Sequence, residues 1–204
     1  AEIPTEISLN VKPQLSGARK VVISPLANEY PLIHYNWVQD NIKKVDQASN
    51  GRIGYIYIPD MGPEGLNEFA RYFYPQLDKE GLIIDDRANG GGNVSPMILE
   101  SLSREPYRLT MGRGTSHVGT VPDAVQVGPK VCLINKYSAS DGDLFPWGFR
   151  ALGLGKLIGT RTWGGIVGIS GSLPYMDGTD IRVPFFTSYD PKTGKWIIEN
   201  HGVD

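Results

Sequence analysis

Several features that would assign a chain to a compartment or a cofactor are scarce in this sequence. The 204 residues include a single cysteine, Cys132, so no internal disulfide can form, and its place in an apolar run predicts an inert core side chain. The three histidines do not combine with it at metal-ligand spacing. We therefore expect no metal and no other cofactor.

Excess charge and long apolar runs are also missing. A formal net charge of -2 gives no electrostatic reason to expect nucleic acid or an anionic membrane as a partner. No apolar run reaches membrane-spanning length, and residues 1–10 lack the basic and apolar regions of a signal peptide. We expect a cytoplasmic protein. A periplasmic or secreted protein whose signal peptide has been removed would show the same sequence features.

The most informative stretch that is present is a strand-to-helix corner at residues 131–153. An apolar run predicts a buried strand at 131–134, and apolar residues recur at helical spacing from 144 to 152. Ser140 lies between the two, where its hydroxyl would stand beside the unpaired N–H groups of the first helical turn. That geometry suits a nucleophile. Helix capping by Ser140 or Asp141 is the alternative, because serine and aspartate are common N-caps.

A second corner lies upstream, at residues 81–102. An apolar strand ends at Asp85, and three consecutive glycines, Gly90 to Gly92, precede a predicted helix. Without Cβ atoms, the N–H groups of such a turn can converge on an anion such as a phosphate or an oxyanion. The spacing is neither that of a P-loop nor that of a dinucleotide fingerprint. A purely structural turn is the alternative.

The remaining pattern predicts the fold class. Strand and helix signals alternate from residue 53 to residue 159, which predicts an α/β fold with a largely parallel core. After Gly165, strand-like runs and a turn signal near residues 190–194 predict an appended antiparallel β region. We interpret residues 1–27 as an N-terminal extension with one or two edge strands, and residues 28–204 as the core domain.

Taken together, the two corners resemble the S41 serine peptidases, and within them the tricorn protease branch. The motifs are D-x-R-x-N-G-G-G from Asp85, N-x-Y-S-A-S-D-G-D from Asn135, and the segment at 156–165. The resemblance extends from about Tyr35 to the end of the sequence. It implies a crotonase- or ClpP-like spiral of β-β-α units, and a homo-oligomer, chiefly a hexamer.

The resemblance also implies roles for individual residues. Ser140, the second serine of S-A-S, would be the nucleophile, and Ser138 would fall on the strand side. The oxyanion-hole N–H groups would come from Asp141 and from Gly91, with Gly92 a close second. The Asp141 carboxylate would either face a basic substrate residue or serve as a helix-start acid.

Activation of the nucleophile differs between the branches of the family. The C-terminal processing branch uses a lysine, but Trp163-Gly164-Gly165 stands at that place here, so Gly165 excludes a Ser-Lys dyad. These three residues would line the substrate cleft, because an aromatic residue followed by glycines lets a peptide backbone come close. Packing of Trp163 against the nucleophile helix is the alternative.

The tricorn branch uses a histidine preceded by a serine, upstream of a PDZ domain, and a glutamate that orients this serine. Glu199 matches the glutamate, but the Ser-His segment and the PDZ domain have no counterpart in this sequence. The general base is therefore expected outside it. Among the histidines present, His34 is expected at the surface and His117 in a polar loop between two strands. His201 is the best substitute, since strand geometry over 198–201 would point it to the same face as Glu199.

These assignments predict a serine peptidase that cleaves short peptides by acyl transfer through a Ser140 acyl-enzyme. A non-catalytic peptide-binding or assembly module with the same fold is the alternative, because the Ser-His segment is absent. A crotonase-like acyl-CoA enzyme would share the fold and the use of backbone N–H groups. The specific S-A-S-D-G-D match disfavours it.

Overall fold

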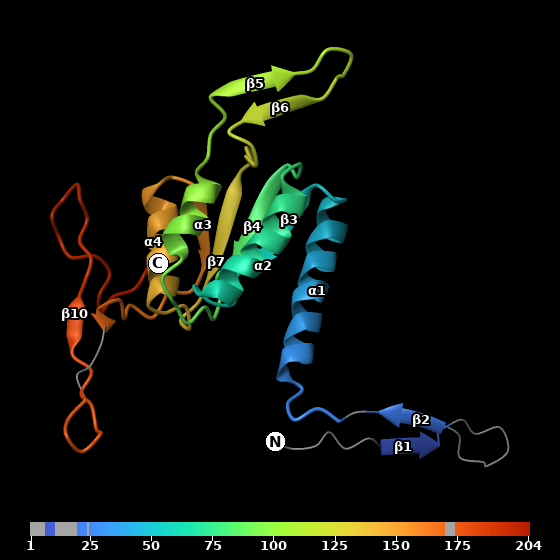
Figure 1. The fold of residues 1–204 in the computed structure, drawn as a ribbon. Coiled ribbons are helices and arrows are strands. Elements are labelled where there is room, and N and C mark those ends of the chain that lie inside the picture. The colour runs from blue at the N-terminus through green and yellow to red at the C-terminus, as the bar shows by residue number, and fades with distance from the viewer. Residues whose placement is uncertain (1–6, 11–19, 24, 170–173) are drawn as a thin grey trace. The chain divides into compact units, whose positions relative to one another are not determined.

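The computed structural model describes residues 7–10, 20–23, 25–169 and 174–204, and Figure 1 shows its fold. The chain forms two compact units, Ala1–Asp40 and Asn41–Asp204, which divide within helix α1 (Tyr30–Ser49). In the first unit, β1 (Ile7–Asn10) pairs antiparallel with β2 (Lys20–Ile23). The domain boundary expected after residue 27 stays a prediction.

The second unit is built on a four-stranded sheet whose strands are all parallel. The order is β3-β4-β7-β8. The strands are β3 (Ile53–Tyr57), β4 (Gly81–Asp85), β7 (Lys130–Ile134) and β8 (Gly155–Gly159). The apolar runs of β3 and β4 are buried almost throughout, as is usual in parallel sheets, whereas β8 is largely exposed. The prediction of an α/β fold with a largely parallel core is confirmed.

Helices connect successive strands of this sheet. They are α2 (Pro63–Phe73), with the short 3-10 helix η1 (Tyr74–Gln76) after it, α3 (Ser95–Leu102) and α4 (Asp141–Ala151). The hydrophobic core is formed by the sheet and these helices, and its fully buried members include Ile56, Ile58, Phe73, Ile84, Ile98, Cys132, Phe145 and Phe149. Cys132 is a buried free thiol, as expected.

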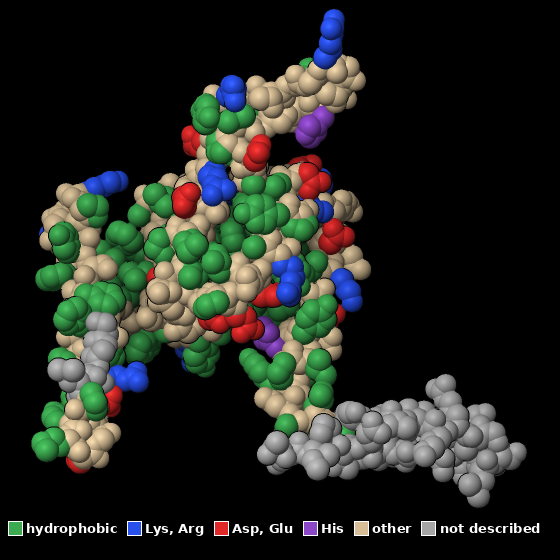
Figure 2. Space-filling model, in the orientation of Figure 1, with side chains coloured by type: hydrophobic (Ala, Val, Ile, Leu, Met, Phe, Trp, Pro, Cys, Tyr) green, Lys and Arg blue, Asp and Glu red, His purple; other side chains and the backbone are tan. Residues whose placement is uncertain are grey.

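Two antiparallel pairs are added to this α/β core. β5 (Arg108–Met111) and β6 (Val118–Val121) form a hairpin between α3 and β7. After Gly165, β9 (Gly168–Ile169) pairs with β10 (Pro184–Phe186), so the expected antiparallel β region is present. Hydrophobic side chains are exposed on this region, and Figure 2 shows them in green. None of the described helices is both long and apolar enough to cross a membrane.

Candidate active site

Two loops meet at the carboxyl edge of the sheet. Because β4 and β7 are adjacent and parallel, the segments that follow them leave the sheet at the same edge. The main-chain N–H of Ala139 donates to the carbonyl of Asn89 at 2.8 Å and joins the two loops. The structure thus brings the predicted glycine-rich corner and the predicted serine corner together.

Ser140 has an unusual backbone conformation between β7 and α4. It occupies the position before the helix, yet its side chain makes no capping hydrogen bond, and its φ and ψ are 58° and -120°. Such a conformation costs a non-glycine residue about 1–3 kcal/mol and tends to persist at functional sites. Ser140 is exposed, whereas Ser138 is fully buried and donates its hydroxyl to the Asp86 carbonyl at 2.8 Å. The capping alternative for Ser140 is therefore wrong.

Asp143, which the sequence did not single out, supports this corner from inside the protein. It is fully buried in the first turn of α4, and its Oδ1 accepts the N–H of Gly164 at 2.7 Å. Burial raises the pKa of Asp143, while the Thr162 hydroxyl and the N–H groups of Gly164, Ser140 and Gly165 oppose that rise. The acid connects the serine corner to the segment that carries Gly164.

The glycine-rich turn comes so close to the serine corner that a side chain would not fit. A Cβ placed on Gly91 would lie 2.6 Å from the Cβ of Ser140 and 2.9 Å from the main-chain nitrogen of Asp141. Gly91 and Gly92 have φ values of 98° and 152°, in the region that favours glycine. Around Gly90, by contrast, a Cβ would meet no atom within 4 Å. Gly91 therefore lies beside both Ser140 and Asp141.

The N–H groups of this turn have different partners. The N–H of Gly91 donates to Oδ1 of Asn89 at 2.9 Å, so this predicted oxyanion donor already carries a hydrogen bond. Gly92 forms a parallel bridge with Met61, in which Met61 bonds to the carbonyl of Gly91 and the N–H of Asn93. In such a bridge the middle residue directs its own N–H away from the partner strand. The N–H of Gly92 therefore points away from Met61.

The side chain of Asp141 is directed into the protein. Its two carboxylate oxygens accept the N–H of Ser95 at 3.0 Å and the hydroxyl of Ser95 at 2.5 Å. Asp141 and Ser95 are both buried, at 5% and 3% exposure. This carboxylate therefore ties α4 to the start of α3 and does not face a substrate.

Trp163, Gly164 and Gly165 lie between the serine corner and the C-terminal turn. The N–H of Trp163 donates to the Ser138 carbonyl at 2.9 Å, and the Gly164 carbonyl accepts the N–H of Asn200 at 2.7 Å. The Trp163 side chain covers Gly165, where a Cβ would lie 2.1 Å from the indole ring. Trp163 is 66% exposed, which does not fit the alternative of packing against α4.

Glu199 is bound to the residues that follow Gly165. Its Oε2 accepts the main-chain N–H groups of Ile166 at 2.6 Å and Val167 at 2.9 Å. Residues 198–201 form a turn and not a strand. The expectation that strand geometry would point Glu199 and His201 to the same face is therefore wrong.

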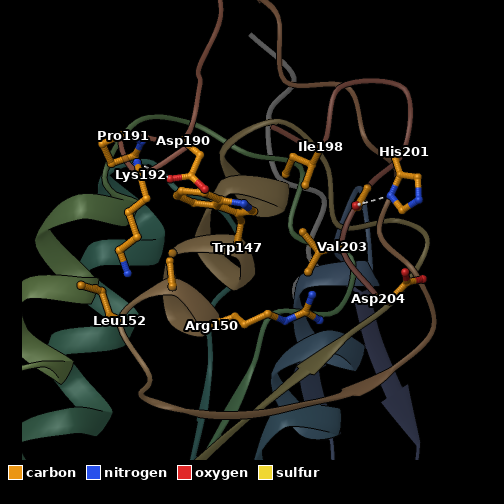
Figure 3. A pocket seen from close by; sticks show the side chains of 13 residues that line it. Trp147, Arg150, Leu152, Asp190, Pro191, Lys192, Ile198, His201, Val203 and Asp204 are labelled. Carbon is orange, nitrogen blue, oxygen red and sulfur yellow. Dashed lines mark hydrogen bonds between the residues drawn. The ribbon is translucent and has the colours of Figure 1, made fainter. Parts of the chain in front are cut away.

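The ring of His201 lines a separate cavity of about 790 Å³ (Figure 3). Trp147 and Arg150 of α4 lie on the same cavity, seven and ten positions after Ser140. At 1.5 Å per residue they are about 10–15 Å along the helix from the predicted nucleophile. Nδ1 of His201 lies 3.0 Å from the Gly202 carbonyl oxygen. His201 therefore lines a cavity along α4, while its main chain lies close to Gly164, where a Cβ would be 2.9 Å from the His201 nitrogen.

The other two histidines do not identify a base either. His34 stacks with Tyr30 and Trp37 along α1, in the first unit. His117 is exposed in the turn that joins β5 to β6, in the polar loop where it was expected.

Two adjacent acids at the end of β4 have opposite surroundings. Asp85 accepts the Tyr55 hydroxyl at 2.5 Å and pairs with Arg87 at 2.5 Å, which explains the D-x-R motif. Asp86 is fully buried, and no described residue hydrogen-bonds to its carboxyl oxygens. Burial raises the pKa of Asp86, and the nearby acids add to the rise. Across the described residues, no group of three or more potential ligands is arranged to hold a metal ion.

Comparison with known proteins gives one consistent family. Residues 52–204 match the model of Peptidase family S41. Tricorn protease of Thermoplasma volcanium is 41% identical over 201 residues, which are 97% of this chain and 19% of that protein. Tricorn protease homolog 1 of Streptomyces coelicolor is 38% identical over 199 residues, 97% of this chain and 18% of that protein.

Solved structures agree with the sequence matches. The crystal structure of the tricorn protease matches with a TM-score of 0.88 and 39% identity, over 98% of this chain and 20% of that chain. The photosystem II D1 C-terminal processing protease matches with a TM-score of 0.53 at 20% identity, over 74% of this chain and 40% of that chain, and so shares the fold alone. The chain spans about a fifth of the length of the curated relatives above.

Proposed function

The chain belongs to peptidase family S41, and we propose that it carries the nucleophile of a serine peptidase that cleaves short peptides. Ser140 is the proposed nucleophile. The observation that carries this proposal is its backbone: an exposed serine held at φ 58° beside a glycine-rich turn, with no capping bond to explain its place. Strain of this kind costs stability, so it favours a functional role for the residue.

The proposed reaction is acyl transfer. Oγ of Ser140 attacks the peptide carbonyl and gives its proton to a base, and the tetrahedral intermediate then expels the amine, which takes up a proton. The acyl-enzyme that remains is hydrolysed by water, which restores the hydroxyl and releases the acid. A serine hydroxyl needs such a base at neutral pH. We place the base outside these 204 residues, because the resemblance to the tricorn branch implies a histidine in a Ser-His segment that has no counterpart in this sequence.

The oxyanion that forms on the carbonyl would be bound by main-chain N–H groups. We assign one donor to Asp141 and the other to the glycine-rich turn, at Gly91 or Gly92. The close approach of Gly91 to Ser140 and Asp141 supports the pairing. Since the Gly91 N–H is bonded to Asn89, Gly92 is the better donor within the turn. One such donor contributes about 2.7–4 kcal/mol to transition-state stabilisation in other serine proteases.

Glu199 and the segment before it complete the proposed site. One oxygen of Glu199 anchors Ile166 and Val167, and no described residue hydrogen-bonds to Oε1, which leaves it for the orienting role implied by the family. The exposed indole of Trp163, with Gly164 and Gly165 after it, would line the substrate cleft. The bonds of this segment to Asp143 and to Ser138 support its place beside Ser140.

Finer features of the family belong to the same proposal. We propose that the α/β fold is a crotonase- or ClpP-like spiral, that the protein assembles into a homo-oligomer, and that it is cytoplasmic. Exposed apolar side chains on the β5–β6 hairpin and around β10, such as Leu109, Met111 and Phe185, support the assembly. The spiral and the compartment rest on the resemblance to the tricorn branch.

A non-catalytic binding or assembly module is the less favoured function. Its basis is the missing Ser-His segment, which says nothing about the strained serine. A module that only bound peptides would gain nothing from holding Ser140 at a positive φ.

Hydrolysis of a fluorogenic peptide library tests the proposed function. The wild-type chain would be assayed with increasing imidazole as an external base, beside Ser140→Ala and the matched buried control Ser138→Ala. We expect cleavage that rises with imidazole, falls to the buffer rate in Ser140→Ala, and survives in the folded fraction of Ser138→Ala. Equal rates for the wild type and Ser140→Ala would contradict the proposal.

A further inference from the structure

Asn89 forms hydrogen bonds to three separate segments at this site. Its side chain is fully buried, although asparagine is usually exposed. Nδ2 donates to the carbonyl of Ile58 at 3.2 Å, just beyond β3, and Oδ1 accepts the N–H of Gly91 at 2.9 Å. Its own carbonyl accepts the N–H of Ala139 at 2.8 Å. Asn89 thus touches the end of β3, the glycine-rich turn and the serine corner.

The hydrogen bond between the Asn89 side chain and the Gly91 N–H restricts a turn whose glycines would otherwise allow many backbone conformations. Gly91 and Gly92 have positive φ values, which glycine adopts about as readily as negative ones, so the glycines alone would not hold one orientation of the peptide planes. The bond from the Gly91 N–H to Asn89 fixes the peptide before Gly91. On the other side of Gly91, the bridge to Met61 fixes its carbonyl. The Gly92 N–H belongs to the peptide whose carbonyl is that of Gly91, so its direction is fixed as well.

The main-chain bond of Asn89 acts on the second proposed donor. Ala139 precedes Ser140, and its bond to the Asn89 carbonyl places the serine corner against the turn. Gly142 packs on the same carbonyl, where a Cβ would lie only 2.4 Å from the Asn89 oxygen. The start of α4, which carries the Asp141 N–H, is therefore held at the same residue.

We propose that Asn89 is the positioning residue of the oxyanion hole: its side chain holds the Gly91 N–H and its carbonyl holds the N–H of Ala139, so it keeps the glycine-rich turn against the start of α4, where the Asp141 N–H lies. The inference rests on the proposed function. It differs from a general structural role, because it predicts loss of transition-state binding in protein that remains folded. Donors that are misaligned lose most of their effect, since their value depends on pre-set geometry.

Asn135 supplies a matched control. Its Oδ1 accepts the N–H of Ala88 at 3.0 Å and the N–H of Tyr137 at 3.0 Å, so it also ties the glycine-rich loop to the serine corner. Neither of these two bonds involves Gly91. Asn135→Ala therefore removes an asparagine link between the same two loops without releasing the proposed donors.

The test compares wild type, Asn89→Ala and Asn135→Ala in two measurements. The first is the second-order rate of fluorophosphonate addition to Ser140 in imidazole buffer, per folded protein. The second is hydrogen exchange of the Gly91 amide by NMR. We expect Asn89→Ala to slow addition about 100-fold, the effect of losing one donor, and to speed Gly91 exchange. For Asn135→Ala, both the rate of addition and the rate of Gly91 exchange should stay within about threefold of the wild-type values.

Equal slowing by the two alanine variants, or none by Asn89→Ala, would overturn the inference while leaving the proposed function intact. A wild-type chain that does not react would contradict the proposed function, and the Gly91 exchange would still decide whether Asn89 orients the turn. If Asn89→Ala does not fold, Asn89→Asp serves in its place, because it keeps an oxygen for the Gly91 N–H. Retained Gly91 protection with lost reactivity in that variant would also overturn the inference.

Discussion

The carboxylate of Asp141 accepts both the main-chain N–H and the hydroxyl of Ser95, at 3.0 and 2.5 Å. These residues start the two helices that follow the two corners, α4 and α3. The pair is buried, so each group depends on the other for its hydrogen bonds. The two corners are therefore joined by their helices as well as by the bond between Asn89 and Ala139.

This pairing predicts a large coupling between the two side chains. Asp141→Ala leaves two buried donors of Ser95 unpaired, and we expect it to lower the free energy of unfolding by about 1–3 kcal/mol. Urea unfolding of both single variants and of the double variant with Ser95→Ala measures the effect. The free energy of unfolding should fall much less in the double variant than the sum of the losses in the two single variants. Additive losses would show that the pair does not interact.

A second prediction concerns space beside Ser140. Gly91→Ala places a Cβ 2.6 Å from the Cβ of Ser140 on a backbone with φ 98°. We expect a loss of about 1–3 kcal/mol in stability and at least about 100-fold in the rate of acylation. The neighbouring change Gly90→Ala meets no atom within 4 Å, and it should alter both quantities little. Similar effects from both changes would contradict the close approach of the two corners.

The local elements of the site could be predicted from the sequence. The apolar runs that end at Asp85 and at Ile134 determine two strands, and glycine or serine residues follow each of them. The resemblance separated Ser140 from Ser138, and the structure leaves the first exposed and buries the second. Such features depend on residues close together in the chain.

The contacts across the site could not be predicted in this way. The partner of Asp141 lies 46 residues away, and the segment bound to Asp143 lies 21 residues away. A helix-start acid has the same local pattern whether its carboxylate faces solvent, substrate or another helix. The expectation for His201 was wrong because residues 198–201 form a turn, to which the alternation of strand side chains does not apply.

Asp86 leads to a prediction about pH. Burial raises its folded-state pKa above the unfolded value of about 3.9, so the folded protein keeps a proton that the unfolded chain releases as pH rises. The contribution of this group to stability is therefore greatest below the unfolded pKa and falls as pH rises toward the folded pKa. Asp86→Asn removes this linkage. Its stability relative to wild type, measured by urea unfolding, should rise as pH increases above the unfolded pKa of about 3.9.

Asp177→Asn is the control for that experiment. The hydroxyl and N–H of Thr179 lower the pKa of Asp177, which is fully exposed, so the sign of its linkage is opposite to that of Asp86. This variant should gain no stability relative to wild type as pH rises. If the Asp86→Asn and wild-type profiles run parallel, Asp86 is not a buried group with a raised pKa.

The intact mass of the chain after exposure to a fluorophosphonate, with imidazole present, tests most directly whether Ser140 is the nucleophile. We predict one covalent adduct on the wild-type chain, located on Ser140 by peptide mapping, and none on Ser140→Ala under the same conditions. An adduct that persists in Ser140→Ala, or a wild-type chain that stays unmodified, would contradict the account.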